Sequence, residues 1–376
     1  MSSVKILHTA DLHIGAAASG IPALSAELKA GAVITFEKII KLAREQQVDI
    51  MLICGDLFHS SYIEPAVVKH IFTAFRSIPQ VKIVYVGGNH DPLSPISPML
   101  YEQKPDNLYI FGGEYSYFEF PELKTRVYGR SFVETYLPHK PFDFECDDSF
   151  INLACLHGEI GADKGGNYNP IDASMLENSG LDYVALGHVH TRTEIRCAGG
   201  TRFAYSGCAQ GQGFDETGEK GVYIGEISKD KCELQFVRMA KKMYLTEQVD
   251  ISAAASSAEA AEIILALLRR KYPDASEHLY KIILTGQTDE GVAFSTEEIA
   301  TRLAGEVYFA KVQDKTEPRI DFEALRLEKT LKGIFADKML SRIQSAETEQ
   351  EKVHLWGALR LGIKAFSQEV AYREDN

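Results

Sequence analysis

Short apolar runs that alternate with helical stretches constrain the fold of this chain most. In the N-terminal part, two stretches with helical spacing of apolar residues, 30–47 and 64–78, separate three such runs. The runs are "VKILHTA", "VDIMLICGD" and "VKIVYVGGN". Nearly all-apolar strands belong to sheets that are covered on both faces. The order strand, helix, strand, helix, strand therefore predicts parallel βαβ units.

The pattern changes after "PDNLYIFGG", where further strand-like segments follow one another with short turns. The sequence therefore predicts a two-sheet β-sandwich core that is flanked by helices, an α/β fold. A chain of 376 residues has room for two or three domains. We expect a catalytic domain over 1–240, a small α/β capping domain over 241–318, and a C-terminal helical segment over 319–376.

The composition is that of an ordinary soluble globular protein, with 45% hydrophobic and 25% charged residues. No apolar run is long enough to span a bilayer, and the N-terminus runs straight into a strand without the pattern of a signal peptide. None of the 6 cysteines forms a CxxC pair. We therefore expect a cytoplasmic protein with no membrane association.

Five polar segments share one placement, because each directly follows an apolar strand. They are "TADLHIG" with Asp11 and His13, "CGDLFHSS" with Asp56 and His59, "GGNHDP" with Asn89, His90 and Asp91, "CLHGE" with His157, and "LGHVHT" with His188 and His190. Each segment alone is explained as a turn or a buried histidine. Together they indicate a metal site, because the carboxyl ends of strands are where open α/β sheets keep their chemistry.

The residue types narrow the choice of metal. Carboxylate and imidazole ligands together suit Mn, Fe or Zn, and we expect Mn. Asp-x-His and His-x-His in extended segments each place two side chains on one face. Asp56 is central enough in the order to bridge two ions. Two divalent ions about 3.5–4 Å apart can clamp a phosphate and generate a hydroxide for in-line attack.

This set of motifs resembles the calcineurin-like metallophosphoesterases over residues 1–240, which implies that family's fold. "GDLFHSS" and the extra domain look like the SbcD-type branch of DNA repair nucleases, and most like the bacterial YhaO-like proteins within it. In the protein phosphatase branch the second motif reads GDxxDRG and the third GNHE. Here they read "GDLFHSS" and "GNHD", which weighs against a phosphatase.

The resemblance implies a role for each site residue. One ion is held by Asp11, His13 and His190, and the second by Asn89, His157 and His188, with Asp56 as the bridge. His90 stabilises or protonates the leaving oxygen, and His59 matches a further active-site histidine.

Three other residues are candidates for substrate contact, each with a plain alternative. Arg130 could face a phosphate or simply lie at a strand edge. Lys164 and Tyr168, in "GADKGGNYNP", could meet a nucleic-acid strand through charge and stacking, or belong to an ordinary loop.

The leading hypothesis for function is a metal-dependent DNA exonuclease in DNA repair. The alternatives are a small-molecule nucleotide phosphodiesterase or phosphatase, and a catalytically weak scaffold subunit. The net charge of −13 conflicts with unaided DNA binding. The resemblance implies an SbcC-like coiled-coil ATPase as a partner and a homodimer. Segment 319–376 is the expected docking site, because it carries more apolar residues than two terminal helices need.

Overall fold

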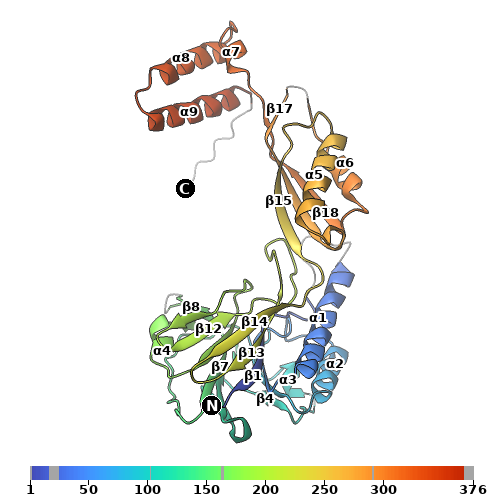
Figure 1. The fold of residues 1–376 in the computed structure, drawn as a ribbon, viewed down its shortest axis with the longest axis vertical. Helices are drawn as coiled ribbons and strands as arrows, with labels where there is room; N and C mark the ends of the chain where they lie inside the picture. The colour runs from blue at the N-terminus through green and yellow to red at the C-terminus, as the bar shows by residue number, and fades with distance from the viewer. Residues whose placement is uncertain (1, 17–24, 102, 162–164, 290–291, 368–376) are drawn as a thin grey trace. The chain divides into compact units, whose positions relative to one another are not determined.

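The computed structural model describes residues 2–16, 25–101, 103–161, 165–289 and 292–367. Two six-stranded sheets with flanking helices form its largest part (Figure 1). The predicted α/β fold with a two-sheet core is confirmed.

The first sheet contains the three strands that the sequence predicts as βαβ units. Its order is β14 (Cys232–Arg238), β13 (Gly221–Ile227), β1 (Val4–Thr9), β2 (Ile50–Cys54), β3 (Lys82–Val86) and β4 (Leu108–Ile110). The neighbours from β1 to β4 are parallel, whereas β13 pairs antiparallel with both β1 and β14. All five residues of β2 are buried, as its apolar composition requires.

Helices α1 (Ser25–Glu45) and α2 (Pro65–Arg76) cover one face of this sheet (Figure 1). Leu7 and Ile53 of the sheet pack in one cluster with Phe36 of α1 and Phe72 of α2. Alternate residues of the same strands enter a different cluster, because successive side chains of a strand point to opposite faces.

The second sheet packs on that opposite face. Its order is β11 (Arg196–Ala198), β12 (Thr201–Tyr205), β10 (Tyr183–Gly187), β7 (Ile151–His157), β6 (Thr125–Arg130) and β5 (Ser116–Phe120). Ile6 and Leu52 of the first sheet share a buried cluster with Leu153 and Tyr183 of the second. The outer face of the second sheet packs against α4 (Ala173–Glu177) through Leu176.

A smaller sheet follows in the chain, with the order β15 (Tyr244–Asp250), β16 (Leu279–Thr285) and β18 (Phe309–Asp314). Helices α5 (Ser257–Lys271) and α6 (Thr296–Leu303) connect its strands. The shorter elements are α3 (Pro98–Tyr101), η2 (Pro121–Leu123), η3 (Ala275–Glu277), β8 (Glu159–Ile160), β9 (Pro170–Ile171), β17 (Gln287–Thr288) and β19 (Glu317–Pro318).

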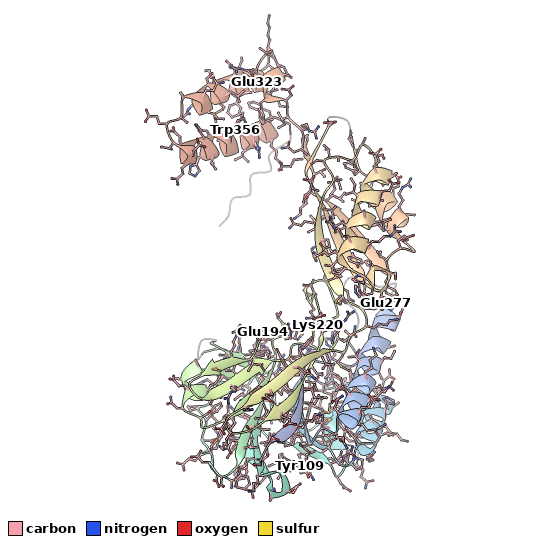
Figure 2. The ribbon with its side chains drawn as sticks, viewed as in Figure 1. Tyr109, Glu194, Lys220, Glu277, Glu323 and Trp356 are labelled. Carbon is pink, nitrogen blue, oxygen red and sulfur yellow. The ribbon has the colours of Figure 1, made fainter. Side chains whose placement is uncertain are left out.

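The C-terminal helices are α7 (Phe322–Leu325), α8 (Leu331–Ser345) and α9 (Glu349–Ser367). Their pattern reads as one helix over 321–344, but the structure breaks it after Leu325. The break has a local cause, because the side chain of Thr330 accepts the amide hydrogen of Gly333 at 3.0 Å and starts α8 anew. Trp356 of α9 contacts Phe322, with 5.3 Å between ring centroids (Figure 2).

The chain divides into two compact units. The first comprises Met1–Glu247, Arg269–Lys281 and Leu303–Lys311, and the second comprises Gln248–Leu268, Ile282–Arg302 and Val312–Asn376. The expected domain limits at 240 and 318 stay a prediction. Among the helices of the described residues, none combines the length and apolar character that a membrane crossing needs.

The two large sheets approach each other closely at Gly187, the last residue of β10. A Cβ atom there would lie 1.8 Å from the carbonyl oxygen of Cys54. Gly187→Ala should therefore lower the free energy of unfolding by about 3 kcal/mol, because the backbone of β2 cannot move aside. Urea unfolding would measure it, with Gly200→Ala as the control, since nothing lies within 4 Å of that glycine. Equal midpoints for the two variants would contradict this explanation.

Candidate metal centre

The five polar segments meet at the carboxyl ends of β1, β2, β3, β7 and β10. Candidate ligand atoms of Asp11, His13 and His190 lie within 4.8 Å of one another, and so do those of Asp11, Asp56 and His157. Asn89 joins them, because its Oδ1 lies 2.9 Å from Nε2 of His157 and 3.2 Å from Nδ1 of His188. All seven candidate ligands are thus in one place, although the ligand roles themselves stay a prediction.

The backbone at the site is strained. Four of the candidate ligands have a positive backbone angle φ, which residues other than glycine rarely adopt. They are Asp11 (50°), His13 (45°), Asp56 (51°) and His188 (97°). Backbone hydrogen bonds hold two of these turns, from the amide of Asp11 to Gly55 at 3.1 Å and from that of His13 to Asp56 at 2.9 Å. Strain of this kind concentrates at functional sites.

Asp91 organises the two loops that carry Asp56, Asn89 and His90. Its buried carboxylate accepts hydrogen bonds from the amides of Asp56 and Phe58 at 3.0 Å, from the amide of Gly88 at 2.8 Å, and from the hydroxyl of Tyr85 at 2.8 Å. Burial, together with the charge of Asp56, raises the pKa of Asp91 to about 7. Asp91 is therefore the orienting carboxylate of the loop.

Asp56 occupies the middle of the site. Its Oδ1 accepts the amide hydrogen of His90 at 2.9 Å, and its Oδ2 lies 3.7 Å from Nε2 of His13 and 3.6 Å from Nε2 of His157. Burial raises the pKa of Asp56, but the electrostatic effect of the surrounding histidines and the hydrogen bond from the amide of His90 outweigh burial and lower the pKa overall. This ionised carboxylate lies between members of both expected ligand sets, as a bridging ligand must.

The histidines are prepared to act as ligands. Nδ1 of His157 lies 2.9 Å from the carbonyl oxygen of Cys54. A carbonyl oxygen can only accept, so Nδ1–H donates and Nε2 keeps its lone pair for a metal ion. Burial lowers the pKa of His13 to about 3 and that of His188 to about 4, so both imidazoles are neutral at pH 7. Neutral imidazoles beside carboxylates form a donor set that fits Mn, Fe or Zn.

Glu216 is a functional residue that the sequence does not reveal. Its carboxylate accepts a hydrogen bond from Nδ1 of His190, which directs Nε2 of His190 to within 3.1 Å of Nε2 of His13. The amide of Gln212 donates to Glu216 at 2.7 Å, and Lys220 Nζ donates to the carbonyl of His190 at 3.0 Å. A carboxylate behind a histidine ligand fixes its tautomer and raises its basicity. No motif marks Glu216, since it lies in a loop without a strand before it.

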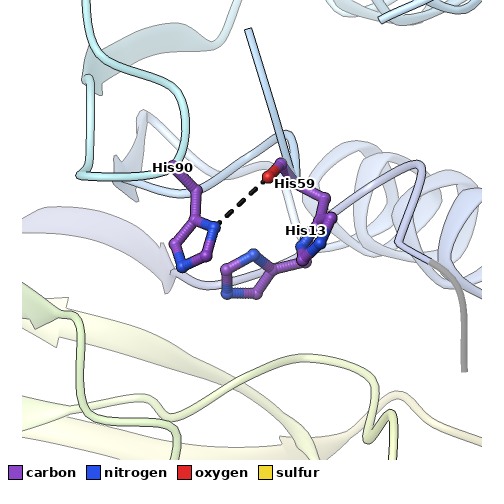
Figure 3. A group of neighbouring side chains, drawn as sticks. All are labelled: His13, His59 and His90. Atoms are coloured by element: carbon purple, nitrogen blue, oxygen red, sulfur yellow. Dashed lines mark hydrogen bonds between the residues drawn. The ribbon is translucent and has the colours of Figure 1, made fainter. Parts of the chain in front are cut away.

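His90 and His59 are exposed and lie next to the buried His13 (Figure 3). The rings of His59 and His90 stack with centroids 5.3 Å apart, and that of His13 lies 4.8 Å from His90. Nδ1 of His90 lies 3.2 Å from the carbonyl oxygen of His59 and donates to it. Nε2 of His90 is therefore the ring atom left to exchange a proton with a bound substrate.

The three candidates for substrate contact have different surroundings. Arg130 is only 6% exposed, and its Nε donates to the carbonyl of Gly113 at 2.9 Å, so it ties backbone segments together. Tyr168 lies beside the site, with its ring 5.1 Å from that of His188. Lys164 lies outside the described residues. Substrate contact by any of the three stays a prediction.

Known proteins share features of this chain. A sequence model described as "Calcineurin-like phosphoesterase" matches residues 4–192, and the chain belongs to this family. It is 25% identical over 308 residues to a protein of Bacillus subtilis (strain 168) named "Uncharacterized metallophosphoesterase YhaO", which covers 77% of this chain and 74% of that protein. A solved structure, TT1561 of Thermus thermophilus, covers 63% of this chain and 100% of its own, at 12% identity and a TM-score of 0.39.

The protein is therefore a metal-binding hydrolase of phosphoesters. Divalent ions in such a site polarise the phosphate and lower the pKa of bound water. Among the residues of the chain, Asp56 lies between the two expected ligand sets, and Nδ1 of His90 is bonded to the carbonyl oxygen of His59.

The assigned roles of Asp56 and His90 can be separated by substitution. We expect Asp56→Ala to lose both metals, because one carboxylate serves both ligand sets. His90→Ala should keep both metals and lose activity by at least about a hundredfold, because this imidazole serves the transition state. Metal analysis of the two purified variants, beside hydrolysis of a nitrophenyl phosphodiester, gives both answers. Loss of metal in His90→Ala, or full turnover by it, would overturn its role.

Proposed function

We propose that this protein is a metal-dependent DNA nuclease that hydrolyses phosphodiester bonds in DNA repair, acting as an exonuclease. The proposal rests on the residues that follow the catalytic part of the chain, in which all seven expected ligands are present. Beyond residue 240 it adds a three-stranded sheet with two helices and then a pair of long helices. A phosphoesterase acting on a small molecule needs little beyond its catalytic sheets. The likeness of "GDLFHSS" to the SbcD-type nucleases supports the same choice.

The open side of the site also suits a diester better than a free phosphate. His59 and His90 are both exposed and lie beside the buried ligands, so a chain can pass over them. Protonated His90 would donate from Nε2 to the oxygen that leaves, while its Nδ1–H stays bonded to the carbonyl of His59. A positioned acid of this kind stabilises the charge that develops on the leaving group.

Hydrolysis of a small nucleotide diester or monoester is the second candidate. The net charge of −13 favours it, because a protein that grips duplex DNA unaided usually carries a basic face. A scaffold with a vestigial site is a weaker candidate, since none of the seven expected ligands has been replaced.

The choice between the first two candidates depends on substrate and metal. With Mn²⁺ we expect cleavage of a labelled DNA strand as well as a nitrophenyl diester, and much less activity with Mg²⁺, which binds imidazole poorly. The protein is stripped with a chelator and given back one metal at a time, with His90→Ala as the inactive control. Hydrolysis of nitrophenyl and nucleotide esters without any DNA cleavage would favour the second candidate. Full activity with Mg²⁺ alone would refute the ligand assignment.

In this proposal the C-terminal helices dock a partner protein, and the partner compensates for the weak DNA affinity expected of an acidic chain. Leu340 and Ile343 of α8 pack with Leu359 and Ile363 of α9 in a buried cluster. Other apolar side chains of the same helices are half-exposed or more: Leu331 (76%), Ile334 (52%), Val353 (68%), Leu361 (72%) and Phe366 (50%). The two helices already bury an apolar cluster between them, yet these five apolar side chains remain exposed. Such an exposed apolar surface on helices suits a helix-in-groove contact with another chain. The proposed partner is an SbcC-like coiled-coil ATPase that supplies most of the affinity for DNA. A homodimer is part of the same proposal.

Removal of the chain after Pro318 tests this docking site. We expect a folded protein with unchanged nitrophenyl diesterase activity that no longer co-purifies with the ATPase, because the cluster of α7–α9 is formed by residues of that segment alone. Replacing the exposed Ile334 and Leu361 by Glu should have the same effect, whereas Lys41→Glu on α1, an exposed residue outside this segment, is the control. Retained ATPase binding by the truncated protein, or tight binding of duplex by the intact chain alone at physiological salt, would contradict the proposal.

A further inference from the structure

Two exposed tyrosines form a row of rings that starts at one of the candidate ligands. The ring of Tyr168 lies 5.1 Å from the imidazole of His188 with 30° between the planes. The ring of Tyr136 lies 6.0 Å from that of Tyr168 with 49° between them. His188, Tyr168 and Tyr136 thus form a row of rings that begins at the candidate metal centre, and we call the two tyrosines the tyrosine shelf.

The loops that carry the shelf are fixed to each other and to the site. The amide of Leu137 donates to Asn167 at 2.8 Å, and the amide of Asn169 donates back to Leu137 at 2.6 Å. Asn169 is fully buried with a positive φ of 48°, and its Nδ2 donates to the carbonyl of His157 at 2.8 Å. Tyr168 is thereby held one residue away from a side chain that is bonded to a ligand residue.

The exposure of the two rings distinguishes them from the tyrosines of the core. Tyr168 is 36% exposed and Tyr136 is 57% exposed, whereas Tyr128 and Tyr183 of the adjoining sheet are 0% exposed. Fixed aromatic rings that remain open to solvent cost little entropy when a flat ligand stacks on them. Any base offers such a face, so stacking of this kind tolerates many sequences.

We propose that the tyrosine shelf stacks a nucleobase next to the phosphate that is cleaved, and so makes the site selective for nucleotide diesters. The inference rests on the proposed function and adds the part of the substrate that is recognised. Tyr168 takes the base nearest to the metal centre, because it lies beside His188, and Tyr136 extends the surface outward. No chemical step is assigned to either hydroxyl group, and both residues act on binding.

The decisive experiment compares two labelled single strands. They are identical except that the second strand has abasic sugars in place of the two nucleotides that flank the cleaved phosphate. Tyr168→Ala should raise KM for the intact strand by roughly five- to a hundredfold, since stacking on one ring is worth about 1–3 kcal/mol per base, with kcat nearly unchanged. On the abasic strand the wild type and the variant should be alike. Tyr168→Phe should restore the wild-type KM, and Tyr136→Ala should show a smaller increase. Tyr117→Ala is the control, because this half-exposed ring packs with Tyr128 and contacts no site residue in the described contacts.

Each outcome decides between a substrate surface and mere packing. If Tyr168→Ala lowers kcat on the abasic strand as well, the ring only supports His188, and the inference is wrong. Unchanged KM on the intact strand overturns it too. If the wild type cleaves neither strand yet hydrolyses nitrophenyl esters, the proposed DNA function fails. In that case the same comparison with nitrophenyl esters of a nucleotide and of an abasic sugar phosphate tests the shelf by itself.

A fluorescent base gives a second reading that does not depend on turnover. A strand with 2-aminopurine beside the target phosphate is bound to the His90→Asn protein with Mn²⁺. We expect stacking to quench its fluorescence, Tyr168→Ala to relieve that quenching by more than half at saturating protein, and Tyr168→Phe to retain it. Quenching that survives Tyr168→Ala and Tyr136→Ala together would place the base elsewhere and overturn the inference.

Discussion

The site depends on the carboxylate of Asp91 and the four donors that surround it. Those donors come from the loop after β2, from β3 and from the loop after β3, so one buried group fixes the two loops that present Asp56, Asn89 and His90. A buried carboxylate is costly unless each oxygen finds partners, and here each oxygen has two. Removing those partners would leave the charge unsatisfied and release both loops at once.

The two carboxylates of this region have opposite electrostatic surroundings. Burial and the negative charge of Asp56 raise the pKa of Asp91, whereas nearby histidines lower the pKa of Asp56 against the cost of its own burial. Asp11 is also fully buried, and burial raises its pKa to about 6. So much negative charge in so small a volume is stable only with positive charge beside it, and divalent cations provide that charge.

Much of the fold and of the site was predictable, and the reasons are local. The all-apolar character of β2 and β3 predicts strands covered on both faces, and the structure covers them on one side by α1 and α2 and on the other by the second sheet. The candidate ligands follow strands, so their convergence follows from the parallel order of these strands in the sheets. Glu216 was not predictable, because its contact with His190 depends on a loop path that no periodicity records. The break between α7 and α8 could not be predicted from the sequence, because the helical spacing of apolar residues continues across it.

The candidate ligands are distributed over a long stretch of sequence, from Asp11 after β1 to His190 after β10, and Glu216 lies further on still. They come from both sheets, which pack so closely at Gly187 that a Cβ atom there would meet the carbonyl oxygen of Cys54. A ribosome must therefore release more than half of the chain before the last ligand can reach the first. Until then the growing polypeptide has scattered histidines but no metal centre, so phosphoester hydrolysis requires that the two sheets have already packed together.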